Sequence, residues 1–406
     1  MNMYPWLLLF GISAAASTQP GVFFDTQSRF VRGSQGGAAC ARVRRLFVPV
    51  HQKESLVCER ADDGSTEAVL LDAAQAAAFE PHATTALLGH GVEGSQLAQR
   101  RTAEGAEQGG PGGPPPSFFM LDLSHLPTPP AVAELGGPPE GCSWGWQPLR
   151  DGRSPRRGVL ERLRDDDEGA LLAAASALGQ WHRSTGFCSS CGAATEAARG
   201  GAIRRCVDEA CGARFRPRLD ASAIVLVASG ERCLLGRKKA WPAGRYSTLA
   251  GFVDFGETVE ECVVREVAEE SGVRVRRDSL RYVASQQWLF PRSLMLGFIA
   301  EAEPQQQDQV RTTDTSGVVS TMHTQALPST LASLLGPAPY CAQVRVQEEE
   351  LEDVRWFDRA VVAAHLAEAE AGGDADGESE QFHVPSRVSL AHTILTQWVR
   401  EGEGFV

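Results

Sequence analysis

The sequence predicts an α+β protein built from several domains, and three observations lead to this fold class. The chain has 406 residues, which is more than one hydrophobic core usually serves and indicates two or three domains. Short alternating apolar runs, typical of strands, fill its first part, whereas a later segment carries apolar residues at helical spacing. Between these regions four cysteines form two close pairs, a pattern typical of a small metal-stabilised module.

The composition is that of an ordinary globular protein. Hydrophobic residues make up 43% of the chain and charged residues 22%, which excludes collagen-like, wholly disordered and disulfide-dense classes. The formal net charge of −12 argues against non-specific binding of a phosphate backbone over the whole surface. The net charge does not exclude a binding site that is basic only locally.

The first 25 residues allow two interpretations. An apolar run, Trp6–Phe10, stands before the small residues Ala14–Ser17, as in a targeting peptide, but no Lys or Arg precedes it. A targeting peptide would make the protein organellar, whereas the C-terminal residues Glu401–Val406 lack the Ser-Lys-Leu tail of peroxisomal proteins. Because no stretch has the roughly 18 apolar residues of a membrane helix, we expect a soluble protein with no membrane contact.

Residues 26–167 are expected to form an N-terminal α/β domain with a Gly- and Pro-rich insertion. The runs Phe118–Leu123 and Glu67–Leu71 are typical of strands, and the insertion covers Ala103–Ser117. Two more segments, residues 305–346 and 367–380, have a composition that buries little surface and are expected to be loosely packed connections.

Residues 168–218 are expected to form a linking helix and a zinc-binding module. Glu168–His182 is rich in Ala and Leu and has no Pro, which favours a helix. Two tight turns follow, each with a Gly just behind its second cysteine, and together they predict one tetrahedral structural Zn²⁺ held by Cys188, Cys191, Cys206 and Cys211. Four thiolates leave no open position, so the metal would stabilise the fold. Two disulfides, or four unrelated buried thiols, are the less favoured alternatives.

The remaining cysteines and the arginines of this module have plainer interpretations. Six cysteines show no paired spacing and are expected to be small core residues: Cys40, Cys58, Cys142, Cys233, Cys262 and Cys341. The arginines between Arg199 and Arg218 could contact nucleic acid. Since no aromatic residues alternate with them, we favour a solvated basic face.

The segment Gly251–Val273 predicts a helix that carries clustered carboxylates. Valines recur at helical spacing and Ser271-Gly272 provides a stop, so a helix is expected from about Thr258 to Glu270. Three carboxylates lie at i, i+3 and i+4 on one face of it: Glu266, Glu269 and Glu270. Such like charges persist where solvent screens them, where cations pair with them, or where they hold hard divalent metal ions. Arg265 is expected to pair with Glu257 and fix the Gly-bracketed loop before the helix.

These residues resemble the Nudix box, GX5EX7REUXEEXGU with U aliphatic, at every position. The matching residues are Gly251, Glu257, Arg265, Glu266, Val267, Glu269, Glu270, Gly272 and Val273. The resemblance implies a C-terminal Nudix α/β/α sandwich at 219–402 with an insertion at 305–346, preceded by the zinc ribbon and a Nudix-like N-terminal α/β domain. It also implies hydrolysis of a nucleoside diphosphate linked to another group.

The resemblance further implies two or three Mg²⁺ or Mn²⁺ ions per site. Such ions neutralise and orient a pyrophosphate and lower the pKa of the attacking water. By position, Glu266 and Glu270 would be the principal ligands, Glu269 a further ligand or base, and the Ala250 carbonyl a backbone ligand. All three glutamates are therefore candidate catalytic residues.

A second segment resembles the SQPWPFPxS array that follows the box in NADH pyrophosphatases. The residues expected to bind substrate are Gln286, Trp288, Phe290, Pro291 and Ser293, whereas Gln287 and Leu289 replace prolines of the array. Aromatic residues can face a planar base and polar groups can face ribose or phosphate. Core aromatics on a strand are the alternative, and the two replacements leave the rigidity of the loop open.

The order of the parts also resembles NADH pyrophosphatases over most of the chain. Glu350, six residues before Trp356, would be the last metal carboxylate, although Glu348, Glu349 and Glu352 lie close to it in sequence and a solvated charge is the alternative. Pro385–His392 resembles the segment whose alanine backbone contacts the nucleotide, which assigns Ala391 to substrate binding.

The resemblance therefore implies a metal-dependent diphosphatase that cleaves NADH, and NAD⁺ as a second substrate, to reduced nicotinamide mononucleotide (or its oxidised form) and AMP. Removal of NAD caps from RNA 5′ ends, with NAD-capped RNA as partner, and hydrolysis of ADP-ribose or another conjugate are alternatives. A non-catalytic zinc-ribbon binding protein is disfavoured, because an inactive site has no physical reason to keep three mutually repelling carboxylates. Family members are often homodimers, and the sequence leaves the oligomeric state open.

Overall fold

The computed structural model describes residues 30–31, 44–91, 116–149, 158–163, 166–304, 350–370 and 382–402. Within these ranges the strands form three separate sheets accompanied by helices, which confirms the α+β class. The expected targeting segment 1–25, the insertion 305–346, Cys40 and Cys341 lie outside the described residues, as does most of the insertion 103–117.

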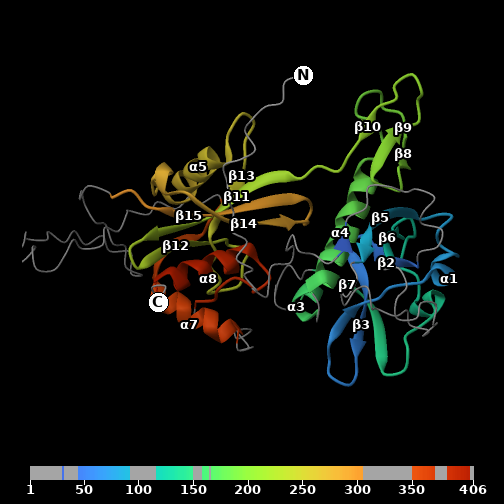
Figure 1. Cartoon of the computed structure of the whole chain (residues 1–406), viewed down its shortest axis with the longest axis horizontal. Coiled ribbons are helices and arrows are strands. Elements are labelled where there is room, and N and C mark those ends of the chain that lie inside the picture. Colours follow the sequence, from blue (N-terminus) through green and yellow to red (C-terminus); the bar gives the residue numbers. More distant parts are fainter. Residues whose placement is uncertain are drawn as a thin grey trace, which may run out of the picture.

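The first sheet is mixed and has the strand order β1-β5-β6-β2-β3-β4, with β7 beside β3 (Figure 1). β2 and β6 pair in parallel, so their side chains alternate in step between the two faces. The predicted strand at 118–123 is confirmed as β6. The elements of this region are β1 (Phe30–Val31), β2 (Arg45–His51), β3 (Glu54–Arg60), β4 (Thr66–Ala68), α1 (Ala73–Ala76), β5 (Thr84–Gly91), β6 (Ser117–Asp122), a 3-10 turn (Val132–Leu135), β7 (Cys142–Pro148) and α3 (Val159–Arg162).

The expected strand at Glu67–Leu71 is too long. β4 ends at Ala68, because the chain turns there towards α1, whose first turn is capped by the Asp72 carboxylate. Leu71 keeps a single antiparallel bridge to Phe47. Residues beyond the strand therefore stay buried without forming a continuous ladder.

The linking helix α4 (Asp166–Ser184) covers one face of this sheet and confirms the helix expected at 168–182. Its apolar residues Leu171, Leu172 and Ala175 pack with Leu46, Val48, Phe118 and Met120 of β2 and β6. The opposite face of the same strands, including Phe47 and Leu121, packs with α1 and the 3-10 turn.

A small antiparallel sheet follows α4, with the order β10-β9-β8. Its strands are β8 (Thr195–Ala198), β9 (Ile203–Cys206) and β10 (Arg214–Phe215). Figure 1 shows this sheet projecting beyond the end of α4. A module of this size buries few side chains, so a structural metal would contribute much of its stability.

The third sheet has the order β14-β15-β11-β12-β16, and β13 pairs with β11. The parallel pair β11 and β15 lies at its centre. The elements are β11 (Asp220–Ser229), β12 (Arg232–Arg237), β13 (Leu249–Phe252), α5 (Val259–Ser271), a 3-10 turn (Arg277–Ser279), β14 (Arg281–Trp288), β15 (Ser293–Glu301), β16 (Asp353–Asp358), α7 (Arg359–Glu370) and α8 (Leu390–Gly402).

Helices cover both faces of this sheet, as expected for an α/β/α sandwich. On β11, Val225 and Val227 pack against α5, whereas Ile224 and Leu226 pack against α7 and α8. The connection expected at 367–380 starts later than predicted, because α7 continues to Glu370. No helix of the described chain is both long and apolar enough to cross a membrane.

Candidate active site and metal centres

The carboxylate helix α5 begins and ends where its local sequence dictates. Thr258 accepts a hydrogen bond from the Glu261 amide (3.2 Å), and the Glu261 carboxylate accepts one from the Thr258 amide (2.9 Å), which forms a capping box. Gly272 ends the helix with φ 69°, a left-handed conformation that favours glycine. The predicted helix is confirmed within one residue at each end.

The two principal carboxylates are buried against the sheet. Val263 and Val267 anchor α5 in the core, and on the adjoining flank Glu266 is buried and Glu270 is 1% exposed. Burial raises the pKa of Glu270 to about 8 and also raises the pKa of Glu266. Both shifts arise because a low-dielectric surrounding disfavours the charged form.

Glu350 joins these two carboxylates from the segment just before β16. Ligand oxygens of Glu266, Glu270 and Glu350 all lie within 4.8 Å of one another. Within the described residues, Glu270 Oε2 is buried without a hydrogen-bond partner. Glu266 and Glu270 are buried and Glu350 is exposed. Converging carboxylate oxygens, one of them buried without a partner, are the donor set that hard divalent cations prefer, so the residues fit such ions.

Glu269 lies apart from this group of three. Its side chain is 51% exposed and pairs with Arg265 (Nη1 to Oε2, 3.0 Å). The structure thus leaves Glu269 outside the group of three and brings Glu350 into it. Ala250, the expected backbone ligand, lies next to Glu270, and a hydrogen bond with its backbone acts to lower the pKa of Glu270.

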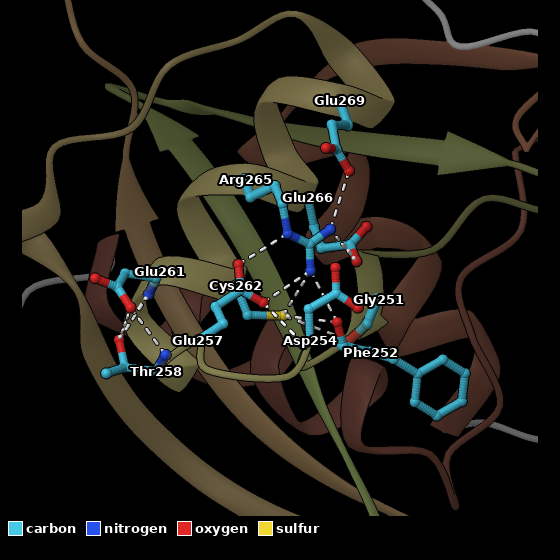
Figure 2. A network of polar contacts seen from close by, with 10 residues as sticks. All are labelled: Gly251, Phe252, Asp254, Glu257, Thr258, Glu261, Cys262, Arg265, Glu266 and Glu269. Atoms are coloured by element: carbon cyan, nitrogen blue, oxygen red, sulfur yellow. Dashed lines mark hydrogen bonds and ion pairs between the residues drawn. The ribbon is translucent and has the colours of Figure 1, made fainter.

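Arg265 ties the Gly-bracketed loop to the helix (Figure 2). Its guanidinium donates to Glu257 Oε1 (2.8 Å), to Glu266 Oε1 (2.9 Å) and to the Phe252 carbonyl (2.9 Å). The expected pair of Arg265 and Glu257 is confirmed, and these bonds hold the pKa of Glu257 at about 2. This network fixes the Glu266 carboxylate and the β13 backbone relative to each other.

Gly251 is required by close packing against the cluster. A Cβ added there would lie 1.8 Å from the carboxyl carbon of Glu266. Only glycine lets the strand backbone pass so near the buried carboxylate. The first residue of the box therefore shapes the carboxylate cluster directly.

A cavity of about 670 Å³ joins this cluster to the second predicted segment. Its wall includes Ala250, Glu266, Glu270 and Glu350, and every residue expected to bind substrate: Gln286, Trp288, Phe290, Pro291, Ser293 and Ala391. Carboxylates thus face aromatic and polar groups across one space. A volume of this size accommodates a small-molecule ligand.

The residues of the array hold the cavity together as well as lining it. Gln286 donates from Nε2 to the Val388 carbonyl (2.9 Å) and accepts from the Leu390 amide (2.9 Å), which joins β14 to the start of α8. The rings of Trp288 and Phe290 meet edge to face at 5.8 Å. Phe290 also packs against the apolar cluster shared by the first sheet and α4.

Several cavity residues had not been predicted. Lys238, Trp241 and Arg245 come from the loop after β12, and the half-exposed Phe252 ends β13. Ser222 and Thr248 are buried there with hydroxyl oxygens that lack a hydrogen-bond partner in the described part of the chain. Phe252 stands next to Gly251 inside the box, a position that could have drawn notice. The others carry no sequence signal, because only the sheet brings them to the cavity.

The four cysteines form a second centre. The sulfurs of Cys188, Cys191, Cys206 and Cys211 lie within 4.8 Å of one another. Cys188 and Cys211 are 3.7 Å apart, and Cys191 and Cys206 are 3.5 Å apart, well beyond the roughly 2.05 Å of a disulfide. Four converging thiols suit a tetrahedral Zn²⁺. Of the other cysteines, Cys58, Cys233 and Cys262 are buried, as expected, and Cys142 is partly exposed.

Comparison with known proteins agrees with both centres. Residues 216–375 match the NUDIX domain, and residues 183–215 match the NADH pyrophosphatase zinc ribbon domain. The fold and the site thus define a Nudix hydrolase, an enzyme class that uses divalent metal ions, and the ribbon indicates Zn²⁺.

Curated relatives place the chain more closely. It is 34% identical over 289 residues to the NAD-capped RNA hydrolase NudC of Mycobacterium tuberculosis, which covers 68% of this chain and 78% of that protein. It is 34% identical over 254 residues to human NAD-capped RNA hydrolase NUDT12, covering 61% of this chain and 45% of that protein. A solved NUDIX hydrolase from Nitrosomonas europaea aligns with a TM-score of 0.31 and 16% identity over 54% of this chain and 93% of that one. The chain belongs to the Nudix hydrolases with an NADH pyrophosphatase zinc ribbon, the family of its NudC-type relatives.

Proposed function

We propose that this enzyme is a metal-dependent NAD(H) diphosphatase, which hydrolyses NADH to reduced nicotinamide mononucleotide and AMP, and NAD⁺ to nicotinamide mononucleotide and AMP. One observation carries the proposal: a single cavity of about 670 Å³ is lined by the carboxylate cluster and by the whole aromatic and polar array. A dinucleotide needs both, because its pyrophosphate is anionic and its bases are planar.

The residues of the carboxylate cluster and its surroundings would have separate roles. Glu266, Glu270 and Glu350 would hold Mg²⁺ or Mn²⁺, two or three ions per site, with the Ala250 carbonyl as a further ligand. When bound, such ions neutralise the pyrophosphate and lower the pKa of a water nucleophile. Glu269, outside the group of three, would act as a further ligand or as a base. Arg265 keeps Glu266 and the β13 backbone in register.

The array would hold the nucleoside end. Trp288 and Phe290 offer aromatic surface, and Ser293 and Pro291 complete that wall. The bonds of Gln286 to Val388 and Leu390 position the segment that carries Ala391, whose backbone would contact the nucleotide. The catalytic unit would be 219–402, with the zinc ribbon and linking helix at 168–218 and the N-terminal domain at 26–167. Pairing of two copies into a homodimer is also part of this proposal.

Removal of NAD caps from RNA is the second candidate. The NudC of Mycobacterium tuberculosis and human NUDT12 are both named NAD-capped RNA hydrolases. Cap removal cleaves the same pyrophosphate bond, so the same cavity would serve.

The test is to incubate the full chain with Mg²⁺ or with Mn²⁺ and four substrates in separate reactions: NADH, NAD⁺, ADP-ribose and NAD-capped RNA. Product masses are read out by mass spectrometry. Mononucleotide and AMP from NADH support the main proposal, and nicotinamide mononucleotide released from capped RNA supports the second. If all four substrates stay intact with both metals, the proposed activity is wrong.

A further inference from the structure

We propose that Lys238 binds the substrate's pyrophosphate oxygens beside the carboxylate cluster. This inference rests on the proposed function for the substrate class. It adds a specificity-determining residue that lies outside the box and outside the array. Three features support it. They are the place of Lys238 in the backbone, the other cationic residues that line the cavity, and the surroundings of the Lys238 ammonium group.

The backbone before Lys238 is firmly held at the cavity. β12 ends at Arg237, and Gly236 exchanges two backbone hydrogen bonds of 2.9 Å with Ser247. The Arg237 side chain donates to Glu352 Oε2 (2.7 Å) and to the Pro242 carbonyl (2.9 Å), which closes the loop that follows. Lys238 is the next residue and lines the cavity, so its position is set by the sheet edge.

Two cationic residues line this cavity among the residues that the structure describes, Lys238 and Arg245. The Arg245 guanidinium lies 4.9 Å from the centre of the Trp241 ring, on which it stacks. The neighbouring Arg265 and Arg237 are paired with carboxylates and do not line the cavity. Across the described ranges, no hydrogen bond or ion pair engages the Lys238 ammonium group.

Lys238 nevertheless lies on the carboxylate side of the cavity. After burial, its positive charge is the strongest influence on the pKa of Glu270, and it acts against the rise that burial causes. An ammonium group close enough to act on Glu270, yet not paired with it, is in reach of a ligand held at the cluster. Because a lysine carries a compact charge on a flexible stem, it can follow phosphate oxygens without demanding one geometry.

The charges require such a group. A pyrophosphate bridge carries two negative charges and enters a space that already holds three carboxylates. Cations at the carboxylates would compensate one side of the bridge, whereas Lys238 would donate charge-assisted hydrogen bonds to the other side. Since the side chain is exposed, we expect an effect near the lower end for hydrogen bonds to charged groups, about tenfold in affinity.

The competing interpretation is that Lys238 serves only to temper the negative charge of Glu270. Both interpretations place a cation near the cluster, but they differ in the ligand that senses its loss. If Lys238 binds phosphate, its loss weakens the binding of ligands that carry a phosphate and leaves the binding of the matching nucleoside unchanged. A tempering lysine affects the affinity of the cluster for metal ions and leaves phosphate preference unchanged.

The experiment compares the dissociation constants of AMP and adenosine for the zinc-loaded full chain in buffer freed of Mg²⁺ and Mn²⁺. Ligand-observed NMR detects the weak binding expected there. Lys238→Gln should reduce the preference for AMP over adenosine about tenfold relative to the unsubstituted chain. Lys239→Gln is the matched control, because Lys239 is exposed and adjacent but does not line the cavity, and it should change the preference less than about twofold.

An unchanged preference in Lys238→Gln overturns the proposal, all the more if its Mn²⁺ affinity rises, as the tempering interpretation requires. An equal loss in Lys239→Gln also overturns it, because the effect would then belong to general surface charge. The binding measurement needs no turnover. A chain that fails to hydrolyse NADH would therefore refute the proposed function without deciding the role of Lys238.

Discussion

Replacing Glu270 by Gln separates the role of this carboxylate in metal binding from its effect on stability. The substitution Glu270→Gln keeps the shape of the side chain and removes its charge. Because Glu270 is 1% exposed and its Oε2 has no hydrogen-bond partner in the described residues, the fold disfavours the charged form of its carboxyl and folding must bind a proton instead. We therefore expect that, when both are free of divalent metal, Glu270→Gln has a larger free energy of unfolding than the original protein.

The size of this effect follows from the pKa. The pKa of Glu270 rises from its ordinary value of 4.5 to about 8, so between these values the folded chain binds more protons than the unfolded chain. Stability contributed by this group is present at low pH and falls as pH rises through that window. At pH 7 the carboxyl is charged in the unfolded chain but mostly protonated in the folded chain, and this proton uptake on folding costs about 3 kcal/mol, which the substitution removes. The melting temperature without divalent metal should rise by roughly 5–10 °C at pH 7 and by little at pH 4.5.

Activity should change in the opposite direction. Loss of a principal metal ligand should remove several kcal/mol of transition-state stabilisation, about a 10³-fold fall in kcat/KM for NADH. The added melting temperature that Mg²⁺ gives the original protein should also disappear. Glu260→Gln is the control, because Glu260 is exposed in the first turn of the same helix. Near-normal turnover, or a lower melting temperature of the metal-free variant at pH 7, would refute the reasoning.

Three more outcomes are expected. Cys206→Ser should lower bound zinc to well below one per chain and reduce the melting temperature; full zinc content by elemental analysis would contradict the ribbon site. Gly251→Ala should place a methyl group 1.8 Å from the Glu266 carboxyl carbon, displacing that carboxylate and reducing kcat/KM by about 10²-fold or more, and unchanged kinetics would count against the close approach. Mn²⁺ affinity should rise up to about tenfold per pH unit between pH 6 and 8, because the Glu270 proton, with its pKa of about 8, must leave first; calorimetry showing a flat profile would contradict this.

The sequence could predict the carboxylate helix because its determinants are local. The cap at Thr258, the stop at Gly272 and the spacing of Glu266 and Glu270 all lie within fifteen consecutive residues, and helix geometry turns that spacing into a common face. The Arg265 and Glu257 pair spans eight residues and was predictable for the same reason.

Residues that long-range pairing brings to the cavity could not be placed from spacing alone. Glu350 meets Glu266 only because β16 pairs with β12 and carries the preceding segment to the sheet edge. Lys238 lies there because Gly236 bonds to Ser247 across the loop. By contrast, Glu269 had the right helical spacing but lies on the Arg265 side of the helix, where it is exposed. Spacing defines a helix face, whereas packing decides which part of that face is buried.

The two replaced prolines of the array show how a local rule can be met by other means. A proline would fix the backbone of the loop, and its absence at Gln287 and Leu289 left the rigidity of the loop open. In the structure β14 continues through this point, because Gln287 pairs with Leu294 and Trp288 pairs with Ser293 on β15. Leu289 is 8% exposed, so burial of its side chain adds a second constraint. A proline at Gln287 would remove a backbone donor from the end of this ladder. Strand pairing and apolar burial thus order the loop that carries Phe290 and Pro291 to the cavity.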